Sequence, residues 1–327
     1  MPGANPEASG SDQPHVERQR ASRPKDGERV LDFSMGQAHL SLRYEQLLIR
    51  RDGMPDLSAP IEDLAVVVLA SRRLTCTLPL LDALMRHGVS VVISDESMHP
   101  SGLLLPLEGH FEQTKRMIAQ ATAKLPVKKR VWQQIVTAKV RAQAANLICY
   151  RGGDAGLMAL ARRVRSGDPA NVESQAAQRY WPHLFDDPAF RRRRDAPDQN
   201  RLLNYGYAVL RATVARAVVA SGLHPSLGVH HHARGNAFCL ADDLMEPYRP
   251  IIDAEVVEIV GEWGGDIGLD GMIKERLVGA LHARVGDRGE DRTAFEWIAR
   301  SAASLARILA GEDPEERLFF PGGLFPR

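Results

Sequence analysis

Three adjacent histidines and a carboxylate cluster shortly after them are the residues of this chain best suited to chemistry. The histidines are His230, His231 and His232, and the segment Ala-Asp-Asp-Leu-Met-Glu-Pro supplies Asp242, Asp243 and Glu246. Imidazole nitrogen with carboxylate oxygen is a mixed ligand set, compatible with Mg²⁺ or Mn²⁺ acting on phosphate and with Zn²⁺ acting in a hydrolase. The pattern H-E-x-x-H does not occur in the sequence, which ranks a zinc hydrolase last.

The spacing of the three acids favours a bound cation without choosing between the aspartates. Asp243 lies three residues before Glu246 and Asp242 lies four before it, so in a helix either aspartate shares a face with the glutamate. Like charges on one face repel unless a cation or a basic group lies between them, and the apolar neighbours indicate partial burial. The alternative is a solvated acidic helix end. Because adjacent histidines point in different directions, we expect at most one of the three to be functional.

A further acid lies upstream, in a segment with strong helix-start signals. Asp168 as N-cap and Pro169 at the first helical position predict a helix that begins there. Glu173 then lies in the first turn, with alanines at i+3 and i+4 that leave room for a ligand. The alternative is a glutamate that only interacts favourably with the helix dipole, by about 0.5 kcal/mol.

The composition is that of an ordinary globular protein with room for two domains. The chain has 327 residues, of which 44% are hydrophobic and 25% charged, and no apolar run approaches the roughly 20 residues that cross a bilayer. The start of the chain lacks the apolar core of a secretion signal, so we expect a cytoplasmic protein. Three scattered cysteines favour neither a disulfide framework nor a thiolate zinc site. With 42 Lys and Arg against 41 Asp and Glu, attraction to nucleic acid requires local basic patches.

The patterning predicts an α+β protein in which the elements change type along the chain. Residues 1–28 are polar, charged and rich in proline, which predicts a disordered leader. Residues 29–106 form a predicted small β-rich domain with one helix, Leu78–Arg86, and residues 107–327 a larger all-α domain that carries the site. The predicted strands are Val30–Phe33, His39–Arg43, Leu47–Arg50, Leu64–Ala70 and Val89–Ser94. The predicted helices of the second domain are Phe111–Ala123, Val131–Ile148, Ala155–Val164, Ala170–Trp181, Arg201–Ser221, Met272–Ala283 and Arg292–Leu309.

Several blocks of the sequence together resemble a known family. They are Asn171-Val172-Glu173 with Ala176 to Trp181, the helix segment Leu203-Asn204-Tyr205-Gly206-Tyr207, the stretch from Gly222-Leu223 to His231, and Leu240-Ala241-Asp242-Asp243-Leu244-Met245-Glu246-Pro247-Tyr248-Arg249-Pro250. From about residue 29 to at least 285, the chain resembles the CRISPR-associated spacer-acquisition integrases, the Cas1 family, and most closely its type II branch.

The resemblance implies a site, a cofactor, partners and a reaction. Carried over residue by residue, Glu173, His231, Asp243 and Glu246 form the metal site, with His230 or His232 as possible replacements for His231. The implied cofactor is Mg²⁺ or Mn²⁺. In the implied reaction the 3′-hydroxyl of a short double-stranded DNA fragment attacks a phosphodiester at a CRISPR repeat. The implied partners are a second copy of the chain, in a homodimer, and a small Cas2-like protein in a larger complex; no membrane is involved.

Local basic clusters are the candidates for contact with the DNA backbone. The sharpest is the run of four arginines, flanked by aspartates that partly cancel its field. A nuclease acting on branched or nicked DNA, and a catalytically idle DNA-binding scaffold, are the alternative functions. The candidate DNA-binding residues are Arg191, Arg192, Arg193, Arg194 and Arg163.

Overall fold

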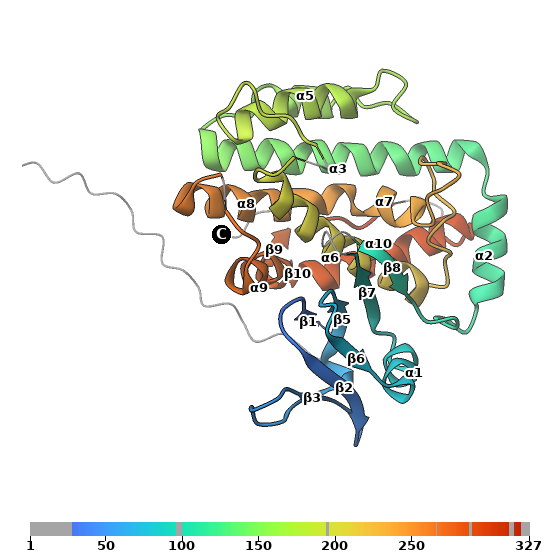
Figure 1. Ribbon diagram of the computed structural model, residues 1–327. Helices are drawn as coiled ribbons and strands as arrows, with labels where there is room; N and C mark the ends of the chain where they lie inside the picture. The colour runs from blue at the N-terminus through green and yellow to red at the C-terminus, as the bar shows by residue number, and fades with distance from the viewer. Residues whose placement is uncertain are drawn as a thin grey trace, which may run out of the picture.

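A β-rich N-terminal region is followed by a larger helical region, as the sequence predicts (Figure 1). The computed structural model describes residues 28–95, 100–193, 196–265, 267–287, 290–313 and 317–321. The predicted leader lies outside these residues, apart from its last member, Glu28. In the described part of the chain, no helix combines the length and apolar character needed to cross a membrane.

Two four-stranded sheets build the N-terminal region. One has the order β1-β5-β7-β8, with parallel pairing up to β7 and an antiparallel edge strand β8; the other has the order β4-β3-β2-β6. The sequence patterns did not predict β4, β6 or β8. The elements are β1 Arg29–Phe33, β2 Ala38–Arg43, β3 Gln46–Arg50, β4 Leu57–Pro60, β5 Leu64–Leu69, β6 Leu74–Cys76, helix α1 Leu78–Arg86, β7 Ser90–Ser94 and β8 Pro100–Leu104.

The continuous apolar character of β5 reflects burial on both of its faces. Leu64 and Val67 belong to the core between the two sheets and α1, whereas Val66 and Val68 belong to the core shared with the helices. A strand covered on both sides reads as an apolar run because neither face meets water. The first sheet is therefore the layer through which the two regions pack.

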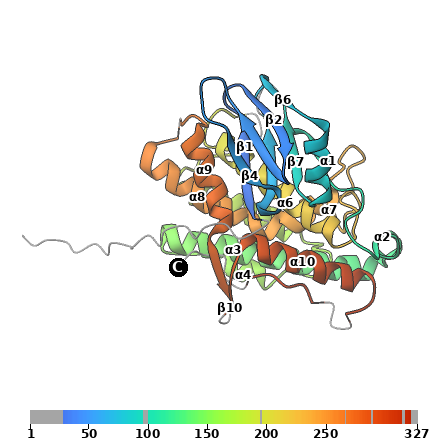
Figure 2. The ribbon, with the colours of Figure 1, turned by 90° about the horizontal axis from the view of Figure 1, so that it is seen from below.

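The helical region is built around two long helices, α3 and α6. Helix α5 lies along α3 in Figure 1, on the side of α3 that faces away from the strands, and Figure 2 again shows the strands on one side of the molecule and α3 on the other. The region also contains the short hairpin β9–β10, which differs from the all-α expectation, and α8, which the patterns did not predict. The helices are α2 Gln113–Thr122, α3 Leu125–Arg151, α4 Leu157–Ala161, α5 Val172–Leu184, α6 Asn200–Ala220, α7 Cys239–Met245, α8 Arg249–Trp263, α9 Gly271–Gly279 and α10 Ala294–Leu309; the 3₁₀ turn η2 is Glu246–Tyr248, and the hairpin strands are Arg284–Asp287 and Glu290–Thr293.

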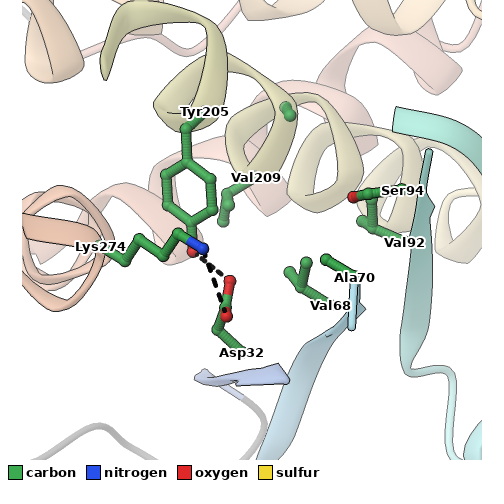
Figure 3. A pocket seen from close by; sticks show the side chains of 9 residues that line it. Asp32, Val68, Ala70, Val92, Ser94, Tyr205, Val209 and Lys274 are labelled. Carbon is green, nitrogen blue, oxygen red and sulfur yellow. Dashed lines mark hydrogen bonds and ion pairs between the residues drawn. The ribbon is translucent and has the colours of Figure 1, made fainter. Parts of the chain in front are cut away.

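Polar groups join the sheet to the helices at the edge of β1. The hydroxyl of Tyr205 on α6 donates to Asp32 at 2.7 Å, and the ammonium of Lys274 on α9 lies 3.9 Å from the same carboxylate (Figure 3). Glu28, just before β1, accepts a hydrogen bond from the Thr293 hydroxyl at 2.9 Å. These contacts, between residues more than 170 positions apart, fix the sheet against the helical region.

Candidate active site

Two glutamates from different elements meet at one lysine in the helical region. Glu173 comes from the first turn of α5, and Glu246 from the turn η2 between α7 and α8. The Nζ of Lys139, in the middle of α3, lies 2.7 Å from Oε1 of Glu173 and 2.5 Å from Oε2 of Glu246. The ammonium therefore bridges two carboxylates that are far apart in the sequence.

Asp168 places Glu173, although not in the way the sequence predicts. The helix begins at Val172, later than the expected start at Ala170, and Asn171 at its N-cap has a left-handed backbone with φ of 50° and no side-chain cap bond. The Asp168 carboxylate instead reaches forward and accepts from the backbone N–H of Val172 at 2.9 Å and of Glu173 at 3.0 Å. Both helix-start donors are satisfied, so the first turn that carries Glu173 is held in place.

Glu246 is buried and surrounded by positive charge. Only 5% of the residue is exposed, and Arg249 contacts its Oε1 at 3.1 Å while Lys139 approaches Oε2. Burial by itself would raise the pKa of this carboxyl, but Arg249 and Lys139 hold it below its usual value. Burial would likewise lower the pKa of the Lys139 ammonium, and Glu246 and Glu173 raise it instead. The cluster therefore consists of charged groups that stabilise one another.

His231 and Asp243 form a second pair beside this cluster. Asp243 is fully buried and accepts from Nδ1 of His231 at 2.6 Å. It also accepts from the backbone N–H groups of Val229 at 2.7 Å, His230 at 3.0 Å and His231 at 3.1 Å. The hydrogen bond to Asp243 raises the pKa of His231, and the charges of Glu246 and Glu173 raise it further. These electrostatic contributions place the imidazole in the field of the glutamate cluster.

The histidine loop is shaped by a glycine and a tryptophan. A Cβ at Gly228 would lie 2.3 Å from the backbone oxygen of His231 and 2.9 Å from Oδ2 of Asp243, so only glycine allows the loop to wrap around that carboxylate. Trp132 on α3 is buried and stacks on His230, with ring centroids 4.0 Å apart. It also meets His231 edge to face at 5.7 Å. The loop is therefore held in place by packing against Trp132 on one side and by hydrogen bonds to the Asp243 carboxylate on the other.

The structure separates the two aspartates and the three histidines that the sequence left open. Asp242 turns away to Arg211, which contacts its Oδ1 at 2.6 Å and its Oδ2 at 2.5 Å. His230 stacks on Trp132 and, like His232, is exposed, whereas His231 is partly buried. Glu173, His231, Asp243 and Glu246 thus lie together, and Asp242 lies outside their group.

The donor set suits a hard divalent cation, although the side chains are not arranged around one. Two carboxylates already converge on a positive charge, and Oε2 of the buried Glu246 lies 2.5 Å from the Lys139 ammonium. Nε2 of His231 is the ring nitrogen that its bond to Asp243 leaves available. As they lie, no three His, Cys, Asp or Glu side chains of the described residues form a group that could hold a metal. The Lys139 ammonium fills the position between the glutamates.

A buried polar network supports the cluster from behind. Asp253 on α8 accepts from the hydroxyls of Tyr180 at 2.9 Å and of Tyr207, and Asn146 donates to Tyr180 at 2.8 Å. Burial raises the pKa of Asp253 to about 7. Arg249, the partner of Glu246, stacks over the Tyr207 ring at 4.8 Å. The network thus connects the scaffold of α3, α5 and α6 to the arginine that contacts the site.

The described members of the four-arginine run, Arg191 to Arg193, do not form one continuous basic face. The Arg192 guanidinium donates to Asn200 at 3.0 Å and to Asn204 at 2.7 Å, and burial lowers its pKa. Arg191 donates to backbone oxygens of its own loop, and Arg193 is exposed. Arg194 lies outside the described residues. Arg163 is exposed, in the segment between α4 and α5.

Sequence reasoning missed Lys139 and Trp132. Lys139 is a lone charge among buried neighbours, because Ile135, Val136 and Val140 on the same helix are all fully buried. A single lysine at an inward position of a buried helix indicates a charge that must be paired, and this pattern could have identified Lys139 from the sequence. The identity of the partners could not be read from it.

Comparisons of sequence point to one family, and solved structures share the fold. The family model described as CRISPR associated protein Cas1 matches residues 34–263. The CRISPR-associated endonuclease Cas1 of Neisseria meningitidis is 39% identical over 275 residues, which cover 83% of this chain and 88% of that protein. Among solved structures, a casposase bound to integration product has a TM-score of 0.74 at 21% identity, covering 91% of this chain and 94% of its own. A Cas6-RT-Cas1–Cas2 complex has a TM-score of 0.72 at 19% identity, covering 93% of this chain and 37% of its own.

Proposed function

The chain belongs to the Cas1 family, and from this premise we propose that it is a metal-dependent DNA endonuclease and integrase of CRISPR adaptation. It joins the 3′-hydroxyl of a short DNA fragment to a CRISPR repeat by transesterification. The observation that carries the proposal is the meeting of Glu173 and Glu246 at one cationic position beside His231. The curated relative named an endonuclease and the casposase bound to integration product support the same chemistry.

Glu173, Glu246 and Nε2 of His231 would hold Mg²⁺ or Mn²⁺. A bound ion of this kind stabilises negative charge on phosphoryl oxygens and is worth several kcal/mol of barrier. Asp243 takes a different role from the one that the resemblance implies, because both of its oxygens are already occupied by the His231 ring and three backbone N–H groups. We assign it to orienting His231, as carboxylates commonly orient metal-binding histidines.

The remaining residues organise the reaction. Asp243 holds Nδ1 of His231, which leaves Nε2 as the ring nitrogen available to an ion. Arg249 keeps Glu246 ionised in a buried position. In the exchange itself, the fragment's 3′-oxygen forms a bond to phosphorus as the repeat's 3′-oxygen leaves, so one phosphodiester replaces another and no water is consumed.

A basic surface next to α5 is suited to the DNA backbone. The backbone oxygen of Lys129 on α3 accepts from the backbone N–H of Gly167 at 2.9 Å, and the Gln133 side chain donates to the backbone oxygen of Val164 at 2.8 Å. These contacts bring Lys129 to the same place as Arg162, Arg163 and Arg165, which lie more than 30 residues later in the sequence. Lysine and arginine there would neutralise phosphates and position the duplex without reading its bases. We define the basic surface by its exposed members: Lys129, Arg162, Arg163 and Arg165.

A joining assay with labelled fragment and repeat duplex tests the site. Glu173→Gln keeps the shape of the side chain and removes its charge, and we expect it to lower Mn²⁺-dependent joining by at least a hundredfold in protein that remains folded, as checked by circular dichroism. Glu275→Gln, on an exposed position of α9, is the matched control and should join at the wild-type rate. Full joining by Glu173→Gln would reject the site.

Blocking the 3′-end of the fragment separates integration from plain cleavage. Joining requires the free hydroxyl and should stop, whereas a nuclease that activates water would continue to cut the repeat. Continued cutting, with no joined product from the unblocked fragment, would replace the integrase with the branched-DNA nuclease.

We also propose that the chain acts as a homodimer and assembles with a small Cas2-like protein. The Cas1–Cas2 complex among the solved neighbours supports the second partner. Light scattering of the purified chain, alone and mixed with a Cas2-like protein, measures both assemblies. A monomer at micromolar concentration would contradict the dimer.

A further inference from the structure

Lys139 occupies the position in which a divalent ion would neutralise the two glutamates. Its side chain is 12% exposed, and those of Glu173 and Glu246 are 22% and 6% exposed. The separation from both carboxylates, 2.7 and 2.5 Å, is that of direct ion pairs. Two carboxylates held this close and this deeply buried would repel strongly without a positive charge between them.

The ammonium and a metal ion cannot share this position. Mg²⁺ binds oxygen at about 2.1 Å and Ca²⁺ at about 2.3–2.6 Å, so an ion bound by the same two oxygens would overlap the place where Nζ now lies. The closest contacts of the ammonium are with Oε1 of Glu173 and Oε2 of Glu246, so the single ammonium neutralises both carboxylates at once.

We propose that Lys139 is an internal counter-ion that holds Glu173 and Glu246 together in the metal-free protein and leaves when metal binds. The proposal rests on the proposed function, because it takes the two glutamates as metal ligands. It explains why the described residues contain no ready group of three ligands, although their donor types suit a divalent ion. The free energy of metal binding is then the gain from the metal–carboxylate contacts minus the cost of breaking the two Lys139 ion pairs. Lys139 is therefore a positioning residue that sets how much metal the site binds.

Removing the ammonium should tighten metal binding and weaken the metal-free fold. Lys139→Met keeps the length of the side chain and its helix preference. In full-length protein, we expect its Mn²⁺ dissociation constant, measured from the free-Mn²⁺ electron paramagnetic resonance signal, to fall at least tenfold below that of the wild type. Its melting temperature without metal should fall by several degrees, and saturating Mn²⁺ should restore it, because a ligand of the folded state stabilises that state.

Arg211→Met is the matched control. Arg211 also forms a close ion pair, at 2.5 Å from Asp242, one residue from Asp243 but outside the cluster. Its loss should lower the melting temperature without tightening Mn²⁺ binding or restoring stability on addition of Mn²⁺. Equal Mn²⁺ affinity for Lys139→Met and the wild type would overturn the proposal.

A measurement on the wild type separates displacement from the general effect of deleting a positive charge. Brief acylation followed by mass spectrometry reports how accessible each lysine is. Lys139 should react slowly without metal and several times faster in saturating Mn²⁺, whereas the exposed Lys129 should react equally in both. If Mn²⁺ leaves the reactivity of Lys139 unchanged or lowers it, the ammonium stays in place and the exchange is wrong. This result is decisive even if Lys139→Met fails to fold.

The outcomes also separate this proposal from the proposed function. If the wild-type protein joins DNA in Mn²⁺ but the reactivity of Lys139 does not change, the proposed function stands and the displacement of Lys139 is refuted. If the wild-type protein neither binds Mn²⁺ nor joins DNA, both the proposed function and the displacement of Lys139 are refuted.

Discussion

The carboxylate of Asp243 organises the histidine loop, and Asp243→Asn should destabilise the protein more than the neighbouring substitution Asp242→Asn. Asp243 is fully buried and accepts four hydrogen bonds, three of them from backbone N–H groups. Asparagine offers one accepting oxygen and an amide that only donates. If the asparagine oxygen faces the backbone N–H groups of Val229 and His230, its NH₂ group faces the backbone N–H of His231. Both of those groups are donors, so no hydrogen bond forms between them.

The magnitude follows from these contacts. One buried N–H without a partner costs about 1–3 kcal/mol, and each remaining bond weakens by about 1 kcal/mol when its acceptor loses its charge. We therefore expect Asp243→Asn to lower the free energy of unfolding by about 3–5 kcal/mol. Asp242 is partly accessible and its partner Arg211 is one-third exposed, so water can replace the pair and Asp242→Asn should lose about 1 kcal/mol.

The assay is urea unfolding followed by circular dichroism, with both midpoint and slope recorded. The pH dependence provides a second check. The folded pKa of His231 is raised, so the stabilisation from its pair with Asp243 is fully present below the unfolded value of 6.5 and is lost as pH rises through the folded pKa. The deficit of Asp243→Asn should therefore be larger at pH 6 than at pH 9. A deficit within 1 kcal/mol of that of Asp242→Asn would refute the reasoning.

Further predictions concern the fold and the basic surface. The folded pKa of Asp253 is raised to about 7, so the free energy of unfolding of the wild type should fall by up to about 1.4 kcal/mol per pH unit as pH rises from 4 to 7. In Asp253→Asn, the tyrosine hydroxyls can rotate to suit the amide, and urea titrations should show no such pH dependence. Gly206→Ala places a Cβ 2.4 Å from Cγ2 of Ile252 and should lower the free energy of unfolding by about 1–3 kcal/mol, whereas Gly261→Ala, with open space around it, should raise it by up to about 1 kcal/mol; equal midpoints in thermal unfolding would contradict the packing. Arg163→Ala should reduce the slope of log DNA affinity against log salt by about 0.9 in filter binding, and an unchanged slope would remove this residue from the DNA surface.

Local patterns were sufficient for the elements and for the acids as candidates. Helix α1 has the predicted bounds, because its proline at the start and glycine after the end are signals within one turn. The start of α5 was predicted too early, because Asp168 caps from four residues before Val172. The hairpin β9–β10 was missed, since neither short strand carries a clear alternating pattern.

The choice between Asp242 and Asp243 could not be made from spacing. Three and four residues before Glu246 are equally good neighbours on a helix, and the helix changes to a 3₁₀ turn at that glutamate. The decision comes from what surrounds α7: Arg211 of α6 on one side and the histidine loop on the other. Similarly, Arg192 looks like a surface charge in the sequence, and it turns inward because two asparagines of α6 face it.

By itself, the sequence determined the change from strands to helices, the family resemblance and the residues Glu173, His231, Asp243 and Glu246 as candidates, because each depends on residue types at short or characteristic spacings. Only the tertiary structure decided that Asp243 holds His231, that Asp242 does not join it, and that Lys139 lies between the two glutamates. Those contacts join residues 12 to more than 100 positions apart. Charges at such separations interact only after the helices pack, since the unfolded chain keeps them apart in water, where their attraction is weak.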